Sequence, residues 1–133
     1  MKVTADTNVL IRSVVRDDKS QAQIADAVLE EATLVAVSLP CLCEYVWVLR
    51  SVYGFTDKDI AESIRILAAT EKVAMNRNAV EAGLAVLEAG GDFADGVMAF
   101  EGNWMGADTF VSFDRKAITL LAKQGASVRL LDV

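Results

Sequence analysis

The chain has 133 residues, of which 53% are hydrophobic, and its formal net charge is −6. This length allows one domain with a core large enough to fold unaided. The sequence has no histidine, which excludes Ser-His-Asp and Cys-His nucleophilic sites and zinc sites that need histidine ligands.

Short apolar segments that favour strands alternate with longer segments of helical periodicity. In chain order, strands are expected at residues 3–5, 34–37, 72–75, 109–113 and 128–131. Ser20 and Gln23 form a capping box that predicts the start of one helix, whose buried face would carry Ile24. Thr56 with Asp59 predicts the start of another helix.

Three further helices are marked by the residues at their ends. Pro40 is expected to begin one helix, and Gly90 is expected to end another. Asp92 would open the next helix, and the last one would run from just after Asp114 to about Lys123.

Strands this apolar, in alternation with helices, imply a parallel sheet covered by helices on both faces. No internal repeat or linker interrupts the pattern. We therefore predict one α/β domain over residues 1–133, with a three-layer α/β/α fold around a central parallel sheet.

No membrane or export segment is expected. Asp6 interrupts the N-terminal region before any apolar stretch typical of a signal peptide, and the longest uncharged apolar run is too short to cross a bilayer. Cys41 and Cys43 lie beside an apolar helical run and are expected to be buried free thiols. These features favour a cytoplasmic protein.

Two aspartates occupy equivalent places in the pattern. Asp6 and Asp114 are each the first acidic residue after an apolar strand and lie just before a helix. In open parallel α/β sheets, functional sites form at the carboxyl ends of the strands, so both are candidates for one shared site. The alternative is that each aspartate only caps its helix, a position that aspartate favours.

Glu44 lies in a helical segment that is apolar on nearly every face. Its neighbours one turn away, such as Cys41 and Trp47, include no cation that could pair with it. A carboxylate in apolar surroundings takes up a proton or finds a distant positive partner. That partner is either a metal ion or an arginine such as Arg12 or Arg50.

Asp92 and Asp95 lie three residues apart at a helix start. Asp92 suits the cap, with a supporting role as its alternative, whereas Asp95 can project from the face opposite the apolar one. Converging carboxylates repel, and either protonation or a cation relieves the repulsion. An all-oxygen ligand set selects Mg²⁺ or Mn²⁺, ions that suit phosphoryl transfer by metal-activated water.

Four segments, in order along the chain, resemble the PIN-domain family and within it the VapC-like ribonuclease toxins of toxin–antitoxin pairs. They are residues 3–11 with Asp6-Thr7-Asn8, residues 44–49 with Glu44, residues 92–99 with Asp95, and residues 110–116 with Asp114. The resemblance covers essentially the whole chain.

The resemblance implies a parallel-sheet domain that cleaves single-stranded or looped RNA with Mg²⁺ or Mn²⁺. The implied metal ligands and catalytic residues are Asp6, Glu44, Asp95 and Asp114. Thr7 and Ser112 would assist by hydrogen bonds to a ligand, water or phosphate. Such toxins usually form homodimers and are held inactive by a small antitoxin. Relatives often have another acid where this chain has Lys116, which leaves a second metal ion open and allows Lys116 to contact phosphate.

An RNA substrate requires positive charge at the rim of the site despite the net charge of −6. The candidate RNA contacts are Arg12, Arg50, Arg115 and Lys116, each of which is otherwise an ordinary solvated charge. The helical aromatic residues Tyr45, Trp47 and Trp104 fit either a dimer or antitoxin surface or ordinary core packing.

Two other classes of function remain open. A Rossmann-like phosphohydrolase or phosphoacceptor domain would also place an aspartate after its first strand. Asn8, however, stands where a haloacid-dehalogenase-like enzyme would have a second aspartate. A non-catalytic domain that only binds a partner is the other alternative, although it would not need all four acids.

Overall fold

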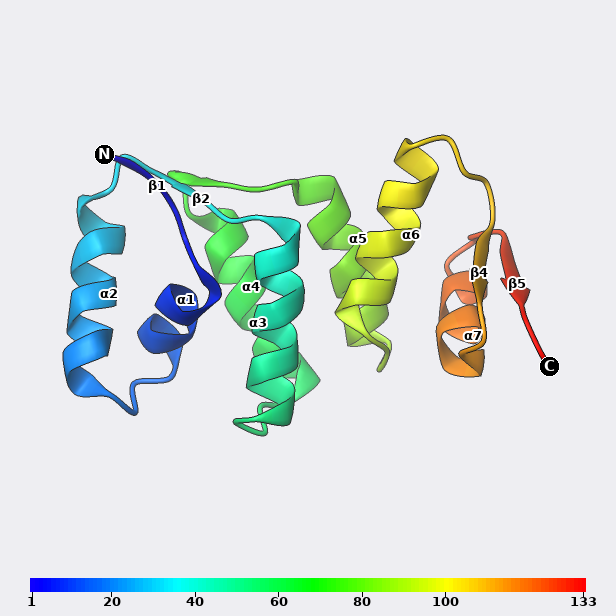
Figure 1. The fold of residues 1–133 in the computed structure, drawn as a ribbon, viewed down its shortest axis with the longest axis horizontal. Helices are drawn as coiled ribbons and strands as arrows, with labels where there is room; N and C mark the ends of the chain where they lie inside the picture. The colour runs from blue at the N-terminus through cyan, green and yellow to red at the C-terminus, as the bar shows by residue number, and fades with distance from the viewer. The chain divides into compact units, whose positions relative to one another are not determined.

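The structure, a computed structural model, describes all 133 residues and contains seven helices and five strands. The elements are β1 (Lys2–Thr4), α1 (Thr7–Val14), α2 (Lys19–Glu31), β2 (Leu34–Ala36), α3 (Leu39–Ser51), α4 (Asp57–Ala69), β3 (Val73–Ala74), α5 (Arg77–Glu88), α6 (Phe93–Trp104), β4 (Phe110–Ser112), α7 (Arg115–Lys123) and β5 (Val128–Leu130). They divide into two compact units, Met1–Asn76 and Arg77–Val133. Figure 1 colours the chain by residue number, from blue at the N-terminus to red at the C-terminus. None of the helices has the length and apolar character needed to cross a membrane.

The first unit is built on a parallel three-stranded sheet in the order β1-β2-β3. Val3 pairs with Val35, and Val35 pairs with Val73. Val35 and Val73 are both buried, as the apolar strands of a parallel sheet require. Helix α1 packs against α2 and α3, and α4 packs against α3 and β3. The carboxyl ends of β1 and β2 therefore lie side by side, and each leads directly into a helix.

Helix α3 is fixed by one fully buried face. Leu42, Tyr45 and Leu49 are 0% exposed, and the Tyr45 hydroxyl bonds Ser63 Oγ on α4 at 2.8 Å, which satisfies its polar atom within the core. Trp47, in contrast, is 62% exposed. The helix thus has a buried face against the unit and an open face that carries Trp47.

In the second unit, α5 and α6 lie against each other (Figure 1). They are joined at Gly90, whose φ of +95° is a left-handed conformation that glycine adopts without strain. Strands β4 and β5 form a parallel pair, and α7 packs against both strands. The turn from β4 into α7 carries Asp114.

Several predictions from local patterns are confirmed. The Thr56 side chain caps α4 by accepting the Asp59 N–H, and Asp92 caps α6. Strands are observed at all five expected places, and their pairing is parallel. The five strands form two small sheets, one in each unit.

The prediction for the start of α2 was wrong. Its N-cap is Asp18, whose side chain accepts the Gln21 N–H at 3.0 Å, and Ser20 lies inside the helix. The buried face is made by Ala22 and Ala25, whereas Ile24 is 66% exposed. Small side chains on this face let α2 lie close to α1, and the larger apolar residue points outward.

Candidate functional site

A hollow in the first unit forms where β1 and β2 end. Asp6 and Thr7, which follow β1, line it together with Pro40, Cys41 and Glu44 of α3. Its volume is about 390 Å³, and it is open to solvent. The parallel pairing of β1 with β2 is what brings the start of α1 and the start of α3 to the same edge of the sheet.

Asp6 occupies the N-cap position of α1 by its backbone (φ −76°, ψ 155°), but its side chain makes no capping hydrogen bond. At five other helices the N-cap side chain does cap the helix; these residues are Asp18, Ser38, Thr56, Asp92 and Asp114. The capping alternative therefore fails for Asp6, whose exposed carboxylate keeps its oxygens free of the helix.

Glu44 is exposed on the open face of α3, which corrects the expectation that its surroundings are apolar. Helical periodicity could not show that Glu44 is exposed, because the residues near it are apolar on nearly every face of the helix and do not indicate which face is buried. The two arginines considered as its partners are engaged elsewhere: Arg12 Nη1 pairs with Asp17 at 3.0 Å, and Arg50 Nη2 pairs with Asp57 at 2.8 Å.

Thr7 and Cys41 form the floor of the hollow. Thr7 is 5% exposed and is the one buried polar side chain in the chain. Burial raises the pKa of the Cys41 thiol, the charges of Asp6 and Glu44 raise it further, and a hydrogen bond with Thr7 opposes the rise. The thiol therefore stays protonated and soft, a poor ligand for a hard cation. Both cysteines are free, Cys41 buried as expected and Cys43 only half-buried.

The hollow is also lined by residues that the sequence analysis did not assign to the site, among them Pro40 and Cys41 of α3. They precede Glu44 by one helical turn, at i−4 and i−3. That spacing is the signal that could have found them, since such residues share a helix face.

In the second unit, Asp92 and Asp114 are caps at the starts of α6 and α7. Asp92 Oδ1 accepts the Ala94 N–H at 3.2 Å. Asp114 Oδ1 accepts the N–H groups of Lys116 at 2.9 Å and Ala117 at 3.2 Å. Asp114 thus caps α7, and it does so through Oδ1 alone.

The carboxyl group of Asp95 is affected by the negative charges of both capping aspartates. It is half-buried in the first turn of α6. Burial raises the pKa of Asp95, and the negative charges of Asp92 and Asp114 raise it further. Like charges that converge in this way are relieved by a proton or by a cation. Phe93 and Val97 of the same helix are buried, whereas Asp95 is only half-buried.

Ser112 has a local role in the structure. Its Oγ accepts the backbone N–H of Asp114 at 2.9 Å, which fixes the turn that carries Asp114. The Ser112 hydroxyl proton stays free for a ligand, water or phosphate. Arg115 and Lys116 follow at the start of α7 and are both exposed.

The four predicted acids divide between the units: Asp6 and Glu44 share the hollow of the first, and Asp95 and Asp114 lie in the second. No three histidine, cysteine, aspartate or glutamate side chains form a group that could hold a metal ion. The donor type fits Mg²⁺ or Mn²⁺, since free carboxylate oxygens are available in both units. Each unit alone supplies too few of them, so a site shared by all four acids stays a prediction.

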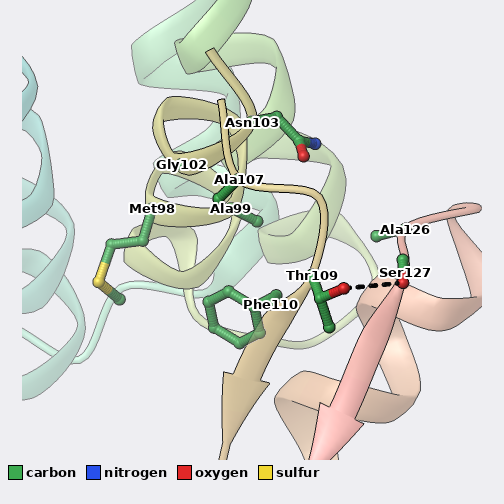
Figure 2. A pocket seen from close by; sticks show the side chains of 9 residues that line it. All are labelled: Met98, Ala99, Gly102, Asn103, Ala107, Thr109, Phe110, Ala126 and Ser127. Atoms are coloured by element: carbon green, nitrogen blue, oxygen red, sulfur yellow. Dashed lines mark hydrogen bonds between the residues drawn. The ribbon is translucent and has the colours of Figure 1, made fainter. Parts of the chain in front are cut away.

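A second hollow, in the second unit, contributes nothing to such chemistry (Figure 2). It is small, about 50 Å³, and its walls include Ala99, Gly102 and Phe110. The hydroxyls of Thr109 and Ser127 lie 3.3 Å apart at its edge. It has no charged side chain that could balance the charge of a metal ion or a phosphate.

Comparison of the sequence with models of known protein families gave no match, and comparison with curated proteins gave none either. A function for this chain is therefore inferred from its residues and from the resemblance of the four segments.

Proposed function

We propose that this protein is a Mg²⁺- or Mn²⁺-dependent endoribonuclease, the toxin of a toxin–antitoxin pair, that hydrolyses RNA phosphodiesters. The observation that carries the proposal is the free carboxylate of Asp6. An aspartate at an N-cap ordinarily accepts a backbone N–H, yet Asp6 makes no such bond and instead lines a hollow with Glu44. Two acids that face one hollow without cations repel each other, and a bound cation relieves that cost.

In this proposal, four acids hold the metal ion: Asp6, Glu44, Asp95 and Asp114. When bound, the ion supplies a more acidic water and stabilises negative charge on the phosphate. Asp95, whose pKa is raised by burial and by the charges of Asp92 and Asp114, would hold the ion through its ionised carboxylate. Thr7 is held in the floor of the hollow and orients its neighbours rather than reacting.

Positive charge for the RNA backbone comes from the start of α7 in this proposal. Arg115 and Lys116 are exposed beside Asp114, where they could meet a phosphate that approaches the carboxylates. Arg12 and Arg50 are held in ion pairs with Asp17 and Asp57, so the structure gives them less support as RNA contacts.

The finer features of the resemblance belong to the same proposal. They are a three-layer α/β/α domain with one central parallel sheet, a homodimer, a small antitoxin partner and a cytoplasmic location. The parallel pairing of the strands fits the first of these, which would require the two small sheets to form one. Trp47 and Trp104 are 62% and 82% exposed, and their indole rings are apolar surfaces that a protein partner could cover.

The direct test compares the wild type with Asp6→Asn on single-stranded RNA in Mn²⁺. We expect cleavage to be lost while the circular dichroism spectrum and unfolding midpoint are kept, because the Asp6 side chain makes no structural bond. A chelator should inactivate the wild type, and Mg²⁺ or Mn²⁺ should restore it. Equal cleavage by both proteins in matched preparations, or cleavage after exhaustive chelation, would refute the proposal.

The free carboxylate of Asp6 also favours a second candidate, a phosphoacceptor or phosphohydrolase domain in which Asp6 is the nucleophile. Incubation with an acyl-phosphate donor separates the two. Covalent phosphorylation of Asp6 would support the second candidate, and the absence of labelling together with Mn²⁺-dependent cleavage would support the first. Absence of both activities and of metal binding by calorimetry would favour a domain that only binds a partner.

A further inference from the structure

Two glycines bring α5 and α6 into backbone contact. A Cβ built on Gly96 of α6 would collide with the carbonyl oxygen of Ala82 and would lie 2.8 Å from the Cα of Gly83 on α5. These distances are shorter than real Cβ contacts, and the colliding atoms are backbone, which cannot rotate away. Any side chain at Gly96 therefore forces the two helices apart.

Gly83 lies at the same crossing on α5, but a Cβ built on it would meet side chains of α6 and not backbone. A Cβ there would lie 2.7 Å from Cε1 of Phe93 and 2.9 Å from Cγ2 of Val97. Both residues are buried. Their side chains can shift in part, so the helix axes need to move less than at Gly96.

Asp95 is the residue directly before Gly96 in the first turn of α6. Asp92, the N-cap of the same helix, lies three residues before Asp95. A movement of α6 away from α5 at Gly96 moves the Asp95 backbone by a similar amount.

We propose that Gly96 is a positioning residue for Asp95: its close approach to the backbone of Ala82 and Gly83 fixes the height and rotation of α6 against α5, and this sets where the Asp95 carboxylate stands. The inference depends on the proposed function, because it assigns Asp95 to a metal site. It adds that Asp95 can serve as a ligand only while the close crossing of α5 and α6 is kept.

The test is Gly96→Ala in the full chain, with Gly102→Ala as the matched control. Both glycines lie in α6, but a Cβ on Gly102 meets nothing within 4 Å, so that variant should bind Mn²⁺ like the wild type. We expect Gly96→Ala to lower Mn²⁺ affinity by roughly tenfold, the range seen when the support of a metal ligand is lost. Calorimetry measures the affinity, and amide chemical shifts at Asp92, Asp95 and Asp114 report the displacement.

A double-mutant cycle separates positioning from general damage to the fold. If Gly96 acts through Asp95, then Gly96→Ala should cause no further loss of Mn²⁺ affinity in an Asp95→Asn background. A loss of the same size in both backgrounds would overturn the proposal. Wild-type affinity in a folded Gly96→Ala protein would overturn it as well.

If Gly96→Ala does not fold, Gly83→Ala presses on the same crossing through side chains. A folded Gly83→Ala protein with reduced Mn²⁺ affinity and shifted Asp95 resonances supports the proposal, and one with shifted Asp95 resonances but unchanged affinity refutes it. Failure of the wild type to bind Mn²⁺ at all would instead refute the proposed function, and the positioning role with it.

Discussion

The backbone N–H of Asp114 donates a hydrogen bond to the Oγ of Ser112 over 2.9 Å, so the last residue of β4 holds the turn that leads into α7. Ser112→Ala removes this acceptor. We expect the free energy of unfolding to fall by about 0.5–1 kcal/mol, as for an exposed hydrogen bond, and Mn²⁺ affinity to fall because Asp114 is held less firmly. Urea denaturation and calorimetry measure the two effects.

Ser112→Thr is the control for this prediction, since threonine keeps the hydroxyl and also suits a strand. It should retain both stability and affinity. Similar losses in Ser112→Ala and Ser112→Thr would show that the hydrogen bond to Asp114 is not the cause.

The two aspartates at equivalent N-caps should differ in their contribution to stability. Asp114→Ala removes a cap that accepts two N–H groups and should lower the free energy of unfolding by about 1 kcal/mol. Asp6→Ala removes no capping bond. Its loss should stay below about 0.5 kcal/mol, the part due to the helix dipole. Equal losses in denaturant titrations would mean that Asp6 is an ordinary cap after all.

Asp95 should make stability depend on pH in a defined direction. Its pKa is raised in the folded protein, so folding favours the protonated form. The stabilisation is complete below the unfolded pKa, about 3.9, and is lost as pH rises through the folded pKa. Ionised Asp95 therefore costs stability near neutral pH. Asp95→Asn should raise the midpoint of thermal unfolding near neutral pH, and the gain should shrink as pH falls.

Asp132→Asn serves as the control, because Asp132 is an exposed acid near the C-terminus. Mn²⁺ should reduce or reverse the advantage of Asp95→Asn, since an ion that binds only the folded wild type stabilises it in proportion to the logarithm of its concentration. No gain near neutral pH, or a gain that grows in acid, would contradict this prediction.

Features of the fold that depend on a few neighbouring residues were predictable. Thr56 caps α4 and Asp92 caps α6 as expected, because an N-cap involves only the residues of the first turn. The prediction that Ser20 caps α2 was wrong for a related reason. Asp18 stands two residues earlier, is an equally good cap, and captures the Gln21 N–H, so the helix begins before the capping box.

Exposure on the helices could not be predicted from periodicity. Glu44 and Trp47 share the open face of α3, yet the sequence around them is apolar on nearly every side. Which face of an apolar helix is buried depends on the elements that pack against it, here through Tyr45 and Leu49. That information is tertiary and is not contained in the segment itself.

The sequence located the candidate acids but not their local partners. Asp6 and Asp114 have the same pattern, a strand followed by an acid and a helix, and only the structure shows that one caps and the other does not. The difference arises from backbone geometry at single residues, which composition and spacing do not encode.

Arginines and lysines near the site should differ in RNA binding according to their existing partners. Arg115 and Lys116 are exposed, whereas Arg50 donates two hydrogen bonds to Asp57, at 3.1 and 2.8 Å. Each free cation that contacts a phosphate should contribute about 0.7 to the slope of log affinity against log salt for a single strand. The double variant Arg115→Ala/Lys116→Ala should therefore reduce the slope by about 1.4.

Arg50→Ala provides the comparison. It should leave that slope unchanged and lower the free energy of unfolding by less than about 1 kcal/mol, as for a partly exposed ion pair. Fluorescence anisotropy of a labelled single-stranded RNA over a range of salt concentrations, with all proteins in the Asp6→Asn background to prevent cleavage, measures the slopes. A reduction in Arg50→Ala equal to that of a single α7 variant would show that the Asp57 pair opens to RNA. An unchanged slope in the double variant would remove the start of α7 from the RNA surface.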